Sequence, residues 1–269
     1  MSRVAEPAVL LAILLAAILL SGIAPKDRAT WILETAPILL GVPILIATRR
    51  RFPLTALVYR LLFLHAILLT VGAHYTFSQV PAGMAVRDAL DLSRNHFDRV
   101  VHFVGGLVPA LLAREILRRK AGLRPGGWLF LLVTLSCLAG SAFYELLEWG
   151  TAEAIGADAS AFLATQGDPW DTQWDMFLGL SGALAGQGLF SRRHEKELRE
   201  QRRIESMGGS MNVFAAMTGR FIGRDVGLRP ATPMRRSQGS RIRTVRDEPA
   251  PRPRRLDAPP HWLALAQAP

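Results

Sequence analysis

WLFLLVTLSCLAGSAFYELLEW, residues 128–149, is an apolar stretch that carries no charged side chain before Glu145. Its length approaches the roughly 20 residues that an α-helix needs to cross the hydrocarbon core of a bilayer. Five further apolar stretches have similar lengths, at residues 7–24, 31–47, 54–73, 98–117 and 173–190. Because a helix satisfies its own backbone polar groups in lipid, these stretches predict an all-α, polytopic membrane helix bundle with about six transmembrane helices.

The charge of the chain is concentrated at its C-terminal side. Half of the residues are hydrophobic, yet the formal net charge is +10. Residues 1–190 are nearly neutral, and residues 191–269 hold most of the excess of Lys and Arg. We therefore expect two parts: a transmembrane bundle over residues 1–190 and a basic, largely disordered cytoplasmic tail over residues 191–269. The tail is expected to contact anionic lipid headgroups. Nucleic-acid binding is disfavoured because no aromatic residues are interleaved with its arginines.

Basic residues also set the expected orientation in the membrane. They cluster at residues 49–51, at residues 118–124 and at residues 192–193, between or after predicted helices. Residues 150–172, which join the last two predicted helices, contain no Lys or Arg and several carboxylates. The positive-inside rule then predicts that both termini are cytoplasmic and that residues 150–172 face outward.

Many ionisable residues fall at the predicted outer ends of the helices, and helix initiation explains some of them. Asn95 and Asp168 occupy positions suited to N-caps, and Asp98 and Asp171 follow three residues later. Carboxylates in the first turn are also favoured by the helix dipole. Asn95 and Asp168 are therefore expected to be N-caps, and Asp98 and Asp171 can be ordinary first-turn acids. Glu115, at the opposite end of its helix and near two arginines, is expected to form an ordinary surface pair.

A second set lies deeper in the apolar stretches. His102 is four residues after Asp98, and Asp175 is four residues after Asp171. An ionisable residue at the bilayer centre costs roughly 2.5–3.5 kcal/mol on insertion scales, and it normally faces the bundle interior. Glu145 and Glu148 share one face at the end of a helix, where the helix dipole disfavours negative charge. A proton, a metal ion or a basic partner such as His102 or Arg99 should compensate them.

These residues predict a candidate metal site. Histidine and carboxylates at helical spacing on facing helices can hold a divalent ion, and this donor set suits zinc, manganese or iron better than copper. The expected ligands are five in number: Asp98, His102, Glu145, Glu148 and Asp175. As catalytic groups, Glu145 and Glu148 would be ligands or a general base, and His102 a ligand or a proton carrier.

Three fragments carry a family resemblance: NHFDRVVHF, YELLEWG and GDPWDTQWDM, which begin at residues 95, 144 and 167. The chain resembles the YjdF-like family of bacterial inner-membrane proteins over roughly residues 10–190. That resemblance implies a multi-pass inner-membrane protein and carries no biochemical role. A weaker similarity is to VanZ-like membrane proteins of the cell envelope. It would match Asp98, His102, Glu145 or Glu148, and Asp175.

The leading functional hypothesis is an outward-facing site of carboxylates and histidine that acts on an envelope lipid or a cell-wall-related molecule. The same residues can bind a metal ion. A small ion-coupled transporter and a non-catalytic membrane scaffold are the alternatives. The only cysteine, Cys137, lies in an apolar stretch and is expected to be a buried hydrophobe. No nucleophile motif or cofactor fingerprint is present, so the sequence leaves open whether the protein is an enzyme.

Overall fold

The computed structural model describes residues 5–155 and 163–222, and within these ranges the regular structure is entirely helical. All six apolar stretches are confirmed as helices. The elements are α1 (Ala5–Ser21), α2 (Arg28–Thr48), α3 (Ala56–Tyr75), η1 (Phe77–Gln79), α4 (Pro81–Ala89), α5 (Phe97–Arg119), α6 (Gly127–Ile155) and α8 (Asp171–Ile222).

Four of these helices are long and apolar enough to cross a membrane: α2, α3, α5 and α6. Helix α1 is apolar but shorter, at 17 residues. The apolar start of α8 is not among the four, since it also contains polar residues such as Asp175 and Gln187, both of which are buried. Multi-pass membrane character is therefore confirmed, while the full count of six spans stays a prediction.

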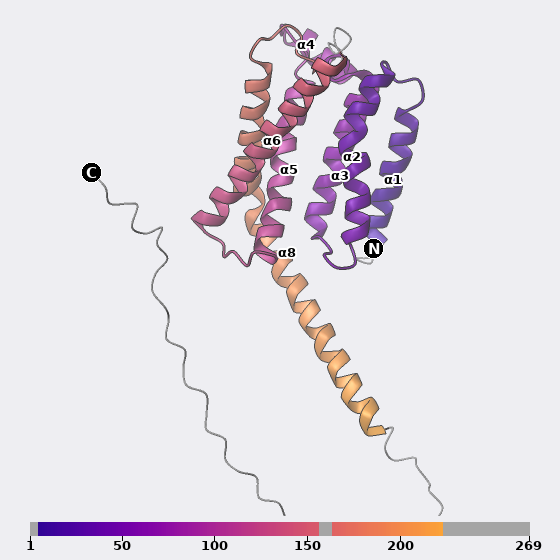
Figure 1. Cartoon of the computed structure of the whole chain (residues 1–269), viewed down its shortest axis with the longest axis vertical. Coiled ribbons are helices and arrows are strands. Elements are labelled where there is room, and N and C mark those ends of the chain that lie inside the picture. The colour runs from indigo at the N-terminus through magenta and orange to yellow at the C-terminus, as the bar shows by residue number, and fades with distance from the viewer. Residues whose placement is uncertain (1–4, 156–162, 223–269) are drawn as a thin grey trace, which may run out of the picture. The chain divides into compact units, whose positions relative to one another are not determined.

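Helix α3 lies at the centre of the bundle and contacts α1, α2 and α5, and α6 packs against α5 (Figure 1). The main apolar core includes Val58 of α3, Leu111 of α5 and Val133 of α6. Cys137 belongs to this core and is buried, as expected. Large apolar side chains on the outer faces of the helices, such as Leu40 and Leu146, are exposed and would contact lipid.

Helices α5 and α8 approach each other closely through glycines. A Cβ atom at Gly106 would overlap the carbonyl group of Gly179, and one at Gly182 would overlap the carbonyl group of Phe103. Gly186 faces Leu107 in the same way. The small residues of α8 thus let it lie directly against α5, as small-residue motifs do in membrane bundles.

Two ends of the bundle can now be distinguished. The carboxylate end is formed by the first turns of α2, α5 and α8 and by the C-terminal part of α6. It holds Glu34, Asp98, Glu145, Glu148 and Asp175. The arginine end is opposite, where residues 49–51 directly follow α2 and residues 118–119 are the last two of α5.

The arginine end contains a buried polar cluster around Glu115, which the sequence predicted to be part of an ordinary surface pair. That prediction is wrong, because Glu115 is fully buried. Its carboxylate accepts hydrogen bonds from the Thr55 backbone N–H at 3.1 Å, the Thr55 hydroxyl at 2.8 Å and Arg119 at 2.8 Å. His194 Nε2 of α8 lies 3.0 Å from it. Helix α8 covers Glu115 and so removes it from the surface.

Helix α8 continues past its apolar part and through the charged residues 192–203 to Ile222. This part of α8 is tied to the bundle, since Glu195 forms ion pairs with Arg118 at 2.6 Å and with Arg114 at 3.3 Å. The remainder of the predicted tail, residues 223–269, lies outside the described residues.

Candidate functional site

The site begins with the two loops that lead into α5 and α8. Asn95 is fully buried, and its Oδ1 accepts a hydrogen bond from the Phe97 N–H at 2.9 Å. Asp168 accepts one from the Trp170 N–H at 2.9 Å. Both side chains bind backbone just ahead of a helix, but neither is the N-cap that the sequence predicted. Helix α5 has His96 at its N-cap, and α8 begins only at Asp171, because each side chain closes a two-residue turn first.

Two arginines connect these loops. Arg94 binds Asp171 at 2.6 Å and Asp168 at 3.4 Å, and Arg99 binds Asp168 at 2.6 Å. The guanidinium of Arg99 also lies 5.0 Å from the ring centre of Trp174. Burial, together with Arg99 and Arg94, lowers the pKa of His96 below its ordinary value. The ion pairs hold the first turns of α5 and α8 next to each other.

One turn deeper, three side chains converge on the same space. His102 Nε2 lies 3.5 Å from Asp98 Oδ1 of the same helix and 4.0 Å from Asp175 Oδ2 of α8. Asp98 and Asp175 are 5% and 3% exposed. One ligand atom from each of the three residues can be chosen so that all lie within 4.8 Å of one another. Asp175 Oδ1 is buried and has no hydrogen-bond partner among the described residues.

Helix α6 brings its glutamates to the other side of His102. Glu145 Oε1 lies 3.8 Å from His102 Nδ1, the ring nitrogen that points away from the two aspartates. Glu145 is buried, and this oxygen finds no hydrogen-bond partner within the described part of the chain. Glu148 is half-buried and close enough to interact electrostatically with Glu145 and His102. All five predicted site residues are therefore brought to one end of the bundle.

The cluster contains two further residues, which the sequence analysis did not assign to the site. Glu34 of α2 is 2% exposed and interacts electrostatically with Glu148 and Asp98. Tyr144 packs its ring edge-on to His102, with 6.4 Å between ring centres. Glu34 could have been found as a carboxylate in an apolar stretch at the same membrane level. Tyr144 offered no signal beyond its place next to Glu145.

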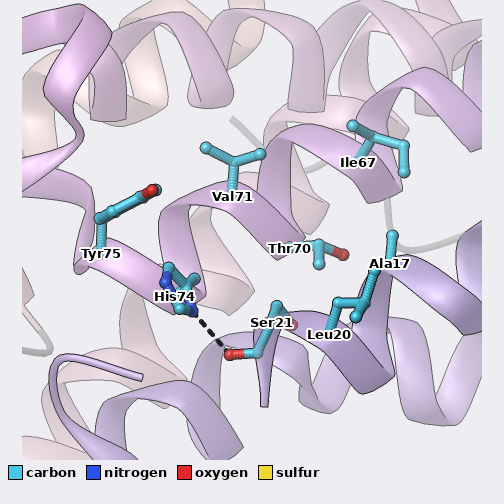
Figure 2. A pocket seen from close by; sticks show the side chains of 8 residues that line it. All are labelled: Ala17, Leu20, Ser21, Ile67, Thr70, Val71, His74 and Tyr75. Carbon is cyan, nitrogen blue, oxygen red and sulfur yellow. Dashed lines mark hydrogen bonds between the residues drawn. The ribbon is translucent and has the colours of Figure 1, made fainter. Parts of the chain in front are cut away.

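The histidine at the end of α3 is not part of this cluster. His74 Nδ1 lies 2.7 Å from the carbonyl oxygen of Ser21, at a small pocket between α1 and α3 that Figure 2 shows. The carbonyl oxygen of His74 accepts a hydrogen bond from the Lys26 N–H at 2.9 Å. The pocket has a volume of about 270 Å³ and is lined mainly by apolar side chains. His74 is thus a structural link between the α1–α2 loop and α3.

The geometry of the main cluster fits a divalent cation. Donor atoms around a tetrahedral zinc ion lie roughly 3.3–3.4 Å apart, since each metal–ligand bond is about 2.0–2.1 Å long. His102 Nε2 lies 3.5 Å and 4.0 Å from the aspartates, and all three ligand atoms lie within 4.8 Å of one another, so the side chains would move closer together around an ion. Glu145 lies by the second ring nitrogen, where a carboxylate commonly orients a metal-bound histidine. The donor set therefore divides into three possible ligands and one orienting carboxylate.

Comparison with known proteins places the chain in a family. Residues 6–196 match the family model described as predicted membrane protein (DUF2238). The chain is also 48% identical over 202 residues to the inner membrane protein YjdF of Escherichia coli (strain K12). The aligned residues cover 74% of this chain and 97% of that protein. No solved structure matches. The predicted resemblance to YjdF-like proteins is confirmed.

Proposed function

We propose, for a chain that belongs to the DUF2238 family of multi-pass membrane proteins, that the carboxylate end binds a divalent metal ion and acts on an envelope lipid or a cell-wall-related molecule. One observation carries the proposal: Asp98, His102 and Asp175 direct ligand atoms into one buried space. Buried carboxylate oxygens without a donor are costly in a membrane protein, and a cation would satisfy them.

The roles of the residues follow from their positions. Asp98, His102 and Asp175 would be the ligands. Glu145 would hold the His102 ring by accepting from its second nitrogen. Glu148, more exposed than Glu145, would be the general base that takes a proton from water or from a substrate hydroxyl. A divalent ion bound here would supply charge stabilisation for an oxygen of the substrate.

The surroundings of the site favour an amphiphilic substrate. Trp149, Trp170 and Trp174 are 63%, 64% and 44% exposed and surround the same end of the bundle. Tryptophan is enriched at the level of the lipid headgroups, where its ring is partly in hydrocarbon and partly in water. A polar site at this level would meet the headgroup of a lipid or the lipid-linked end of a cell-wall precursor.

The orientation belongs to the same proposal. Arginines at residues 49–51 and 118–119 lie at the arginine end, so the positive-inside rule directs this end and both termini to the cytoplasm. The carboxylate end then faces the envelope. The basic tail would contact anionic headgroups of the cytoplasmic leaflet. Reporter fusions at residue 160 and at the C-terminus should report opposite sides of the membrane.

Metal content is the direct test. The purified protein, reconstituted with zinc, manganese or ferrous ions and desalted, should retain about one ion per chain by elemental analysis. His102→Gln and Asp175→Asn should abolish retention, because each removes a ligand. Glu145→Gln should weaken affinity by about 10–100-fold, as loss of an orienting partner does. Asp88→Asn is the matched control, since this exposed carboxylate pairs with its neighbour Arg87 outside the cluster and should leave metal content unchanged.

Three results would contradict the proposal. Wild-type protein without any retained ion would exclude the metal site. Equal retention by His102→Gln would place the ion elsewhere. Loss of the whole protein could impair growth under envelope stress while substitution of His102 or Asp175 does not. In that case the cluster would be a structural network in a scaffold.

A further inference from the structure

A large cavity lies on the other half of the molecule, between α1, α2 and α3, with part of α8 at its mouth. Its volume is about 1360 Å³. Pockets for drug-sized ligands usually enclose about 300–1,000 Å³, so this cavity can take a larger molecule. Its lining includes none of Asp98, His102, Glu145 and Asp175, which makes it separate from the proposed metal site.

One face of α2 shows how deep the cavity is. Ile38, Val42, Leu45 and Arg49 line it at helical spacing, with the arginine at the end. Arg49 follows Ile38 by eleven positions, which corresponds to about 16 Å at about 1.5 Å per residue. The hydrocarbon core of a bilayer is about 30 Å thick, so a single leaflet supplies about half of that. The apolar part of the cavity therefore matches the depth of one leaflet.

The mouth of the cavity carries charges of both signs. Three arginines and three glutamates line it: Arg49, Arg50, Arg60, Glu6, Glu197 and Glu200. Arg60 and Glu6 pair with each other at 2.5 Å, and Glu197 accepts hydrogen bonds from the Leu57 N–H at 2.9 Å and from Arg193 at 3.4 Å. Arg49 and Glu200 also have interaction partners, so the charges at the mouth are balanced. A purely anionic headgroup would meet the glutamates as well as the arginines. A headgroup that contains both a phosphate and an amine complements both signs.

We infer that this cavity binds one phospholipid with a zwitterionic, amine-bearing headgroup, taken from the leaflet at the arginine end. Its acyl chain lies along the apolar face of α2. Its phosphate meets the arginines of the mouth, and its amine meets the glutamates. This site does not depend on the proposed metal site at the opposite end.

Gly41 offers a way to fill the cavity without a clash. It lines the cavity, and a Cβ atom added there has no heavy atom within 4 Å. A Gly41→Trp side chain should therefore occupy the space of the lipid chain. Gly140→Trp is the matched control, because Gly140 also lies inside a membrane-capable helix with no heavy atom within 4 Å of an added Cβ, and it does not line the cavity.

The test reconstitutes the full chain into vesicles of equal parts phosphatidylethanolamine and phosphatidylglycerol, extracts it in mild detergent, and counts retained lipid by native mass spectrometry. Wild type and Gly140→Trp should retain one phosphatidylethanolamine per chain, and Gly41→Trp none. Arg50→Gln should retain it about tenfold more weakly, since it loses a charge-assisted hydrogen bond to phosphate. Arg192→Gln, at an exposed arginine that does not line the cavity, should behave as wild type.

Clear results would overturn the inference. Equal retention by Gly41→Trp and Gly140→Trp would show that the lipid is held elsewhere. Preferential retention of phosphatidylglycerol would refute the zwitterionic headgroup, and loss of all lipid from wild type would refute the site. If Gly41→Trp does not fold, Ala66→Phe on α3 fills the same cavity and replaces it in the comparison.

Discussion

Replacing Glu115 by Gln should destabilise the bundle strongly, although the two side chains have nearly the same volume. The Glu115 carboxylate is fully buried and receives the Thr55 N–H, the Thr55 hydroxyl and the Arg119 guanidinium, with His194 at 3.0 Å. A glutamine amide turns one of the two acceptor atoms into a donor that faces other donors. Arg119 also loses its charged partner in a poorly solvated place.

The expected cost can be estimated from those contacts. Removing one partner of a buried, hydrogen-bonded ion pair costs about 3–5 kcal/mol, and we expect Glu115→Gln to fall in that range. Unfolding of the purified protein by a denaturing detergent, followed by circular dichroism, measures the difference. The matched control is Asp88→Asn, whose carboxylate also pairs with an arginine but is 65% exposed, so its loss should cost less than about 1 kcal/mol.

A small effect would refute this reasoning. If Glu115→Gln and Asp88→Asn lowered the free energy of unfolding equally, Glu115 would be solvated, and α8 would not cover it. A double-mutant cycle with His194→Ala adds a second check, because coupled residues in one hydrogen-bond network show interaction free energies of about 0.5–3 kcal/mol.

Two further perturbations test the contacts that build the carboxylate end. Gly106→Ala should destabilise the protein by about 1–3 kcal/mol in the same unfolding assay and reduce metal retention, because its Cβ meets the Gly179 carbonyl, whereas Gly140→Ala should do neither. Asp27→Ala should cost about 1 kcal/mol, since Asp27 caps α2 by accepting from the Thr30 N–H at 2.6 Å. That hydrogen bond lowers the pKa of Asp27 in the folded protein below its ordinary value of 3.8. The stabilisation by Asp27 is therefore complete above pH 3.8 and is lost as the pH falls through the pKa of the folded state. A stability difference between wild type and Asp27→Ala that persists below this pKa would contradict the capping role.

The helices were predictable because hydropathy alone determines them. In a membrane, an apolar stretch near 20 residues has few alternatives to a helix, so α2, α3 and α5 begin and end within three residues of their predicted limits. The short helix α4 was missed. Its residues lie between two predicted transmembrane helices, and their polar and apolar side chains alternate too briefly to indicate a helix.

The burial of Glu115 could not be predicted from local sequence. Two of its partners come from elsewhere in the chain: Thr55 precedes it by 60 positions, and His194 follows it by 79. An arginine four residues away made a surface pair the natural interpretation. Burial depends on which helix covers that face of α5, and this is a property of the packed bundle.

In the candidate site, too, some contacts follow from spacing within one helix and others depend on how two helices pack. The pairing of Asp98 with His102 follows from helical spacing, so the sequence could predict it. The approach of Asp175 depends on how α8 is placed against α5, and the glycines decide this. Gly106 lies four residues after His102, Gly179 lies four residues after Asp175, and these two glycines meet where the helices cross. The crossing is thus one turn from the site on both helices and sets the rotation and height at which Asp175 faces His102. These small residues are therefore what brings the two halves of the proposed metal-ligand set together.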